Sequence, residues 1–144
     1  MSVSKIVDMK LLSLNIWCGK VYTPLMDYIK EQAKDTDIFC FQEVLDTPTD
    51  NTSTRNFRAN IYEELGKILP NHVGYFSSEQ EGVDPIGNVN FPITFGKAMF
   101  IRKSLDVKNV DDVFNIIQKA LKNKNIKELL GGPIVHSGFK RLTD

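Results

Sequence analysis

The sequence has no excess charge of either sign. Its 18 basic residues equal its 18 acidic residues, so the formal net charge is zero. A balanced charge creates no long-range field that would attract an anionic polymer, and this argues against a strongly basic nucleic-acid surface. It leaves room for a local site that binds a single phosphate group.

Cysteine and histidine are scarce and form no metal-binding or redox motif. Cys18 and Cys40 lie in apolar surroundings with no CxxC pattern and no Cys/His cluster. We therefore expect reduced core thiols and a cytoplasmic protein. His72 and His136 have no nearby carboxylate partner in the sequence, and we expect each to be a surface or packed residue.

Long apolar runs are also absent. No segment reaches the ~18 continuous apolar residues that a membrane span requires. The N-terminal residues lack the cleavage pattern of a signal peptide. The 144 residues, of which 42% are hydrophobic and 25% charged, are instead typical of one globular domain.

Apolar runs and helical periodicity alternate along the chain. Residues 10–16 are a β-branched and leucine-rich run, and residues 38–41 are a continuous apolar run. Both are too short for helices, which predicts two buried strands. A helix that Thr23 caps, with Pro24 in its first turn, is predicted between them. This strand–helix–strand order favours neighbouring strands in an α/β (α+β) fold with a mixed sheet and flanking helices.

The later segments are predicted from the same signals. We expect helices over residues 55–69 and 111–130 and strands over residues 72–76 and 95–102. Residues 77–92 hold two glycines and two prolines and are predicted to form a long surface loop. The basic residues Arg58, Lys97 and Arg102 are expected on solvated faces.

Two polar residues stand where buried strands usually carry none. Asn15 ends the first predicted strand and Glu43 ends the second. If the strands are neighbours, both side chains emerge at the carboxyl-terminal edge of the sheet, where ligands of such sheets bind. Carboxylate and carboxamide oxygens suit Mg²⁺ rather than zinc. The alternative is that Asn15 is a turn residue and Glu43 a solvated strand end.

The segments that carry these residues resemble the opening of the endonuclease/exonuclease/phosphatase superfamily. The first is LLSLNIW, which contains Asn15, and the second is DIFCFQEV, which contains Gln42 and Glu43. A weaker third match is FGKAMFIRK over residues 95–103. The family includes DNase I-like nucleases, abasic-site endonucleases, inositol-polyphosphate phosphatases and bacterial-type sphingomyelinases.

The resemblance implies a fold and a division of the chain. We expect residues 9–104 to form the N-terminal half of a DNase I-like four-layer α/β sandwich. Residues 1–8 would be an N-terminal extension, and residues 105–144 a helix and tail that do not match the family. Because such a half would leave one sheet face uncovered, we expect self-association or a second chain that completes the sandwich.

The resemblance also implies a reaction, the hydrolysis of a phosphodiester or phosphomonoester with Mg²⁺, or with Mn²⁺ in its place. The substrate would be a small molecule, a lipid head group or a nucleic acid. Glu43 would be the catalytic carboxylate and metal ligand, and Asn15 would help to position the metal or the phosphate. Gln42 would orient Glu43 without touching the ion. The ion would polarise the phosphoryl oxygen.

The family's later motifs have no counterpart here. Residues 105–144 contain neither the Asp-x-Asn motif nor the Asp-His pair that would supply a general base. Proton transfer by such groups typically contributes about 10²–10⁴-fold in rate. Two functions therefore stay open: a truncated or split phosphoesterase, and a non-catalytic module that uses the half-fold to bind a partner.

Overall fold

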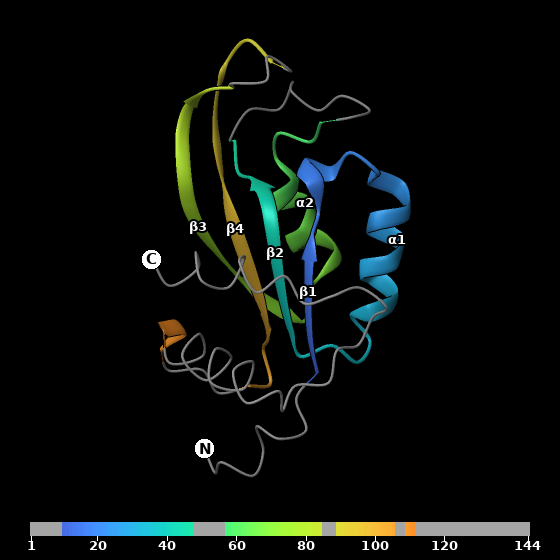
Figure 1. The fold of residues 1–144 in the computed structure, drawn as a ribbon. Coiled ribbons are helices and arrows are strands. Elements are labelled where there is room, and N and C mark those ends of the chain that lie inside the picture. The colour runs from blue at the N-terminus through green and yellow to red at the C-terminus, as the bar shows by residue number, and fades with distance from the viewer. Residues whose placement is uncertain (1–9, 48–56, 85–88, 106–108, 112–144) are drawn as a thin grey trace.

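The computed structural model describes residues 10–47, 57–84, 89–105 and 109–111 (Figure 1). They form a mixed four-stranded sheet with two helices, which is an α+β architecture. The elements in chain order are β1 (Leu11–Asn15), α1 (Tyr22–Gln32), β2 (Ile38–Leu45), α2 (Ile61–Ile68), β3 (His72–Val83) and β4 (Pro92–Arg102). A short 3₁₀ turn (Trp17–Gly19) separates β1 from α1.

The sheet has the strand order β1-β2-β4-β3. β1 and β2 are parallel, with Leu11 opposite Ile38, and α1 connects them. This confirms the predicted neighbouring strands. β4 pairs antiparallel with β2 on one side and with β3 on the other, so β3 and β4 form a long hairpin at the edge of the sheet.

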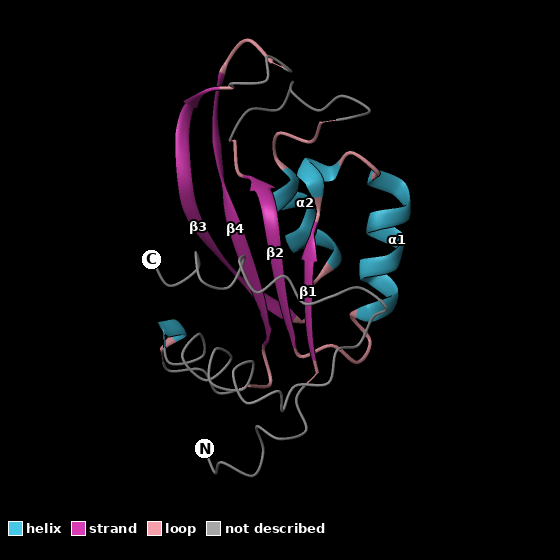
Figure 2. Ribbon diagram, in the orientation of Figure 1, coloured by secondary structure: helices cyan, strands magenta, loops and turns pink. Residues whose placement is uncertain are grey.

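Both helices pack on one face of the sheet (Figure 2). The apolar stripe of each helix meets every second residue of the strands, because successive strand residues point to opposite faces. The central residues of this core are Met26, Ile29, Ile61 and Leu65 from the helices and Leu12, Phe39, Phe41 and Phe100 from the sheet.

The opposite face of the central strands is also buried, so the expectation of an uncovered sheet face was wrong for these strands. Its side chains alternate along the strands with those that face the helices, and none is more than 4% exposed. They are Leu11, Ile38, Cys40, Met99 and Ile101. A strand that is buried on both faces usually has a nearly continuous run of apolar residues in its sequence. This is why β1 and β2 could be predicted from the sequence. Within the described residues no helix has the length and apolar character needed to cross a membrane.

Both helix starts differ from the prediction. Thr23 lies inside the first turn of α1, and the capping position is Val21, which makes no side-chain bond. α2 begins at Ile61 rather than at residue 55. The backbone just before α2 makes hydrogen bonds outside the helix. The Arg58 N–H donates to the Cys18 carbonyl at 3.0 Å, and the Ala59 carbonyl accepts the Thr47 N–H at 2.9 Å.

The prediction of a surface loop over residues 77–92 was wrong for residues 77–83 and for Pro92, which belong to strands. β3 continues to Val83 and β4 begins at Pro92. The added strand residues are mostly polar and exposed, so no alternating apolar pattern marks them, and the backbone ladder with β4 holds them instead. Residues 1–8 and, apart from its first residue, the predicted helix over 111–130 lie outside the described residues.

Gly96 allows β3 and β4 to approach closely. A Cβ at this position would lie 1.9 Å from the Ser77 carbonyl oxygen. Only a shift of the backbone could remove this clash. We predict that Gly96→Ala lowers the free energy of unfolding by about 2 kcal/mol or more. Urea denaturation measures the change.

Gly66→Ala is the matched control. Nothing lies within 4 Å of a Cβ built on Gly66 in α2. Alanine there should stabilise the protein by about 0.5–1 kcal/mol through helix propensity. Equal effects of the two substitutions would contradict the close approach at Gly96.

Candidate functional site

β1 ends beside β2 at one end of the sheet. β2 itself continues to Leu45, so the expectation that Glu43 ends this strand was wrong. The two strands are parallel and in register, with Asn15 opposite Gln42, and Glu43 follows directly. The carboxamide and the carboxylate that the sequence singled out therefore reach the same carboxyl-terminal edge. This is the edge at which open α/β sheets bind ligands.

Glu43 occupies a β-bulge. The register of β2 against β4 shifts between Phe41 and Val44, so that Gln42 and Glu43 together oppose one residue of β4. Glu43 has a φ of 56°, in the left-handed region. This conformation costs a non-glycine residue roughly 1–2 kcal/mol and persists only where the surrounding structure enforces it.

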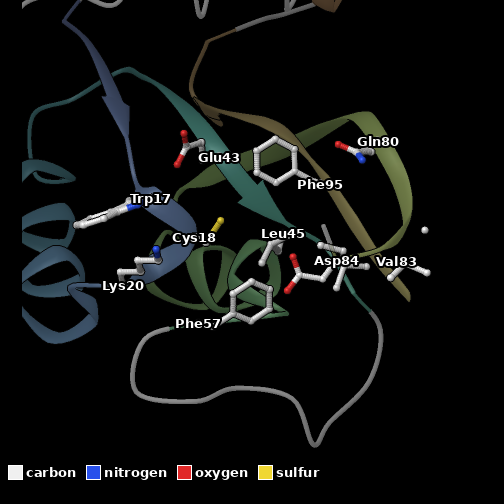
Figure 3. Close-up of a pocket in the computed structure, with 12 residues that line it drawn as sticks. Trp17, Cys18, Lys20, Glu43, Leu45, Phe57, Gln80, Val83, Asp84 and Phe95 are labelled. Carbon is white, nitrogen blue, oxygen red and sulfur yellow. The ribbon is translucent and has the colours of Figure 1, made fainter. Parts of the chain in front are cut away.

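The bulge directs the half-buried Glu43 side chain away from the regular pleat. Its carboxylate lies on the side that carries Trp17, Cys18 and Lys20 (Figure 3). The neighbouring Val44 is fully buried in the core. The backbone around Glu43 is therefore anchored while its side chain reaches the surface.

Asn15 is exposed, and its Oδ1 accepts the backbone N–H of Trp17 at 2.9 Å. It thereby begins the turn in which Trp17, Cys18 and Gly19 have φ values of 49°, 54° and 76°. Asn15 therefore acts as a turn residue, which was one of the alternatives considered from the sequence. Because a carbonyl oxygen has two lone pairs, a contact to a metal is compatible with this bond and stays a prediction.

The strained turn is held against the start of α2. A Cβ on Gly19 would lie 2.6 Å from Ile61 Cδ1 and 2.7 Å from Arg58 Cγ, so only glycine fits this contact. The Arg58 N–H also donates to the Cys18 carbonyl. These contacts fix the position of Trp17, which precedes them in the turn.

Gln42 is 4% exposed and lies behind the candidate site. Its Nε2 donates to Ser13 Oγ at 3.0 Å and to the Cys40 carbonyl at 3.4 Å. Its Oε1 is buried without a hydrogen-bond partner. These bonds hold Gln42 to β1 and to its own strand, and its role in orienting Glu43 stays a prediction.

A pocket of about 240 Å³ opens beside Glu43 (Figure 3). Much of its wall is apolar, and these side chains come from three separate segments, with Leu45 in β2, Phe57 before α2, and Ile93 and Phe95 in β4. Trp17 and Lys20 also line the pocket, and the Lys20 ammonium lies 4.6 Å from the centroid of the Trp17 ring. Asp84, also in the wall, accepts the backbone N–H of Val89 at 3.3 Å.

The Cys18 thiol in this pocket is held in its protonated form. Burial, followed by the charge of Glu43, raises the pKa of Cys18 to about 11. The thiol therefore stays protonated at neutral pH, whereas nucleophilic cysteines depend on the thiolate. Burial also raises the pKa of Cys40, and both cysteines are free.

The donor atoms at the edge fit a hard cation. Glu43 offers a carboxylate and Asn15 a carboxamide oxygen, and Mg²⁺ is commonly bound by one or two protein carboxylates while it keeps several waters. Within the described ranges, no group of three or more His, Cys, Asp or Glu residues could hold a metal ion. A metal here would depend on Glu43 and on water.

The other basic residues singled out in the sequence have partners of their own. Arg58 pairs with Glu64 and stacks over the Tyr22 ring at 4.0 Å. Lys97 is 3% exposed and pairs with Glu79. The expectation of a solvated Lys97 was therefore wrong, because β3 extends far enough to bring a carboxylate to it.

The pocket itself was missed in the sequence analysis. Its wall forms only where the long β3–β4 hairpin, the end of β2 and the segment before α2 meet. No local pattern marks residues that come together in this way. The one usable signal was Gly19, which indicated a turn directly after Asn15.

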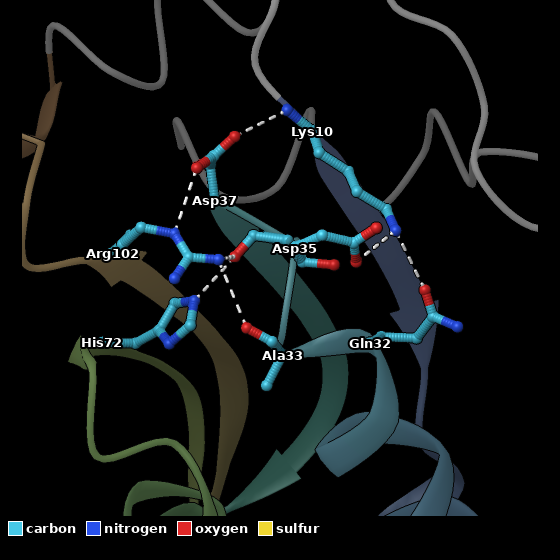
Figure 4. Close-up of polar contacts among 8 residues, drawn as sticks. Lys10, Gln32, Ala33, Asp35, Asp37, His72 and Arg102 are labelled. Carbon is cyan, nitrogen blue, oxygen red and sulfur yellow. Dashed lines mark hydrogen bonds and ion pairs between the residues drawn. The ribbon is translucent and has the colours of Figure 1, made fainter.

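His72 begins β3 and pairs with Arg102 at the end of the strands far from Glu43. Figure 4 shows the polar contacts around it. Its Nε2 is 2.8 Å from the Thr36 carbonyl, which also accepts a bond from Arg102 at 2.7 Å. Asp37 joins Arg102 to the backbone N–H of Lys10. His72 is thus a packed residue and is remote from Glu43. The sequence analysis expected it to be either a surface residue or a packed one.

This packing predicts a pH dependence of stability. Burial lowers the pKa of His72, and its Nδ1 is buried without a partner. As pH falls through the unfolded-state pKa of about 6.5, the unfolded chain binds a proton that the folded chain resists, so stability decreases. Urea denaturation between about pH 7.5 and 5.5 should show this slope, and His72→Gln should flatten it. An unchanged slope in the variant would disprove the assignment.

The left-handed backbone at Glu43 gives a second test. Glu43→Gly should be more stable than Glu43→Ala by about 1 kcal/mol, because only glycine adopts this conformation without strain. At the exposed helical residue Asp27 the order should reverse, with alanine more stable by about 1 kcal/mol. Thermal or urea unfolding of the four variants measures both differences, and the same order at both positions would exclude the bulge geometry.

Comparison with family models, with curated proteins and with solved structures gives no match for this chain. The function proposed for it therefore rests on the sequence resemblance and on the geometry of the residues that carry it.

Proposed function

We propose that the chain is a Mg²⁺-dependent phosphoester hydrolase of the endonuclease/exonuclease/phosphatase type, with Glu43 and Asn15 as its metal-binding residues. The observation that carries the proposal is the strained bulge that directs Glu43 to the edge where β1 also ends. Strained backbone of this kind concentrates at functional sites. The described α+β unit would then be one half of a DNase I-like sandwich.

Each residue has a defined task in this proposal. The Glu43 carboxylate binds the ion, and the free lone pair of the Asn15 carbonyl positions the ion or the phosphate. Lys20, which lines the same pocket, adds positive charge beside the phosphate. When bound, Mg²⁺ polarises the phosphoryl oxygen and offsets charge on the leaving group. Mn²⁺ would suit the same oxygen ligands.

A non-catalytic binding module is the second candidate. It is favoured by the small number of metal ligands, because the part of the chain that is described holds no cluster of three acidic, His or Cys residues suited to an ion. Such a module would bind a partner through this edge without hydrolysing it. The two functions differ in their dependence on Mg²⁺.

Calorimetric titration with Mg²⁺ and hydrolysis of bis(nitrophenyl) phosphate test the first candidate. Glu43→Gln removes the charge but preserves the shape, so it should weaken Mg²⁺ binding by about tenfold or more and lower kcat/KM by about 100-fold. Glu31→Gln, at an exposed residue of α1, is the matched control and should change neither value.

Two results would contradict the proposal. The wild-type chain could show neither Mg²⁺ binding nor Mg²⁺-dependent hydrolysis, which would favour the binding module. Alternatively, Glu43→Gln could leave both values unchanged, which would remove Glu43 from the site.

A further inference from the structure

We infer that the pocket beside Glu43 binds a flat aromatic group attached to the phosphate of the substrate. This inference rests on the proposed function and specifies its substrate class, an aromatic phosphoester. The pocket and the metal-binding edge share Glu43, so one ligand can occupy both.

The pocket has the size and lining that a single ring system requires. Its volume is about 240 Å³, whereas an apolar cavity of about 150 Å³ already binds benzene and drug-sized ligands occupy about 300–1,000 Å³. Phe57 and Phe95 contribute two aromatic rings to the wall, and Leu45 and Ile93 contribute aliphatic side chains. Aromatic pairs favour offset-stacked or edge-to-face contacts, which a flat ligand can make.

Two of the pocket's charged groups, Glu43 and Lys20, lie apart from most of its apolar wall, whereas Asp84 lies within that wall. Glu43, Trp17 and Lys20 lie together on one side of the view, and Phe95 and Val83 lie on the other (Figure 3). A phosphate held at the Glu43 side, next to the Lys20 ammonium, would place its organic group toward the apolar wall. The buried Asp84 carboxylate in that wall already accepts a backbone N–H.

The backbone keeps apolar surface exposed at this pocket. Trp17 is 56% exposed and Val83 is 81% exposed. Trp17 stands in a turn of three left-handed residues, and the close packing of Gly19 on α2 maintains that turn. Large exposed apolar groups that line a hollow mark a binding surface more often than single scattered ones do.

Trp17 is the sole tryptophan of the chain, so its fluorescence reports on the pocket directly. The first titration uses benzyl alcohol without metal, with butanol as the non-aromatic comparison. We expect saturable binding of benzyl alcohol and at least about tenfold weaker binding of butanol. The second titration uses phenyl phosphate and methyl phosphate with Mg²⁺, and phenyl phosphate should bind about tenfold more tightly or better.

Two variants locate the binding. Val83→Glu places a charge in the apolar part of the pocket and should weaken benzyl alcohol binding by about tenfold. Val73→Glu is the matched control, because Val73 is a 40% exposed valine near the opposite end of the same strand, and it should leave binding unchanged. Circular dichroism confirms that both variants fold.

The outcomes separate this inference from the proposed function. Loss of Mg²⁺ binding in Glu43→Gln, with benzyl alcohol binding retained, supports both the inference and the proposed function. Benzyl alcohol binding in a chain that does not bind Mg²⁺ would support the pocket and contradict the hydrolase. Absence of a Trp17 response, equal binding of butanol, or equal weakening by Val83→Glu and Val73→Glu would each overturn the inference.

Discussion

β2 forms backbone hydrogen bonds on both of its edges and is buried on both of its faces. β1 pairs with it in parallel and β4 antiparallel, and Phe39, Cys40 and Phe41 are fully buried. A shift in its register would move apolar side chains to the wrong face and leave backbone groups unpaired. The bulge is thereby locked between two partners. This constraint supports the strained backbone of Glu43 and, with it, the candidate site.

The second strained segment borders the same pocket. The turn after Asn15 carries three successive left-handed residues and is held by the packing of Gly19 against Ile61. Backbone strain at Glu43 and at this turn therefore converges on one small volume, while α1 and the α2 core are regular. The packed network around His72 stabilises the far ends of the strands. This polar network and the candidate site thus lie at opposite ends of the strands.

The parts of the fold that the sequence predicted are those with a strong local signal. β1 is leucine-rich and β2 begins with four apolar residues, and their parallel pairing follows from the helix between them. The extension of β3 was missed because its polar residues are held by the backbone ladder with β4 rather than by buried side chains. That error led directly to another, since Lys97 is buried beside Glu79, a residue of the segment expected to be a loop.

The sequence by itself determined which strands are buried, that they are neighbours, and that Asn15 and Glu43 reach one edge, because apolar periodicity and chain direction are local properties. Only the tertiary structure decided the bulge at Glu43, the exposure of Trp17 and the apolar pocket between them. These features arise where β4, the β3–β4 hairpin and the segment before α2 meet the end of β2. Contacts between segments far apart in the chain produce no periodic pattern in the sequence of any single segment.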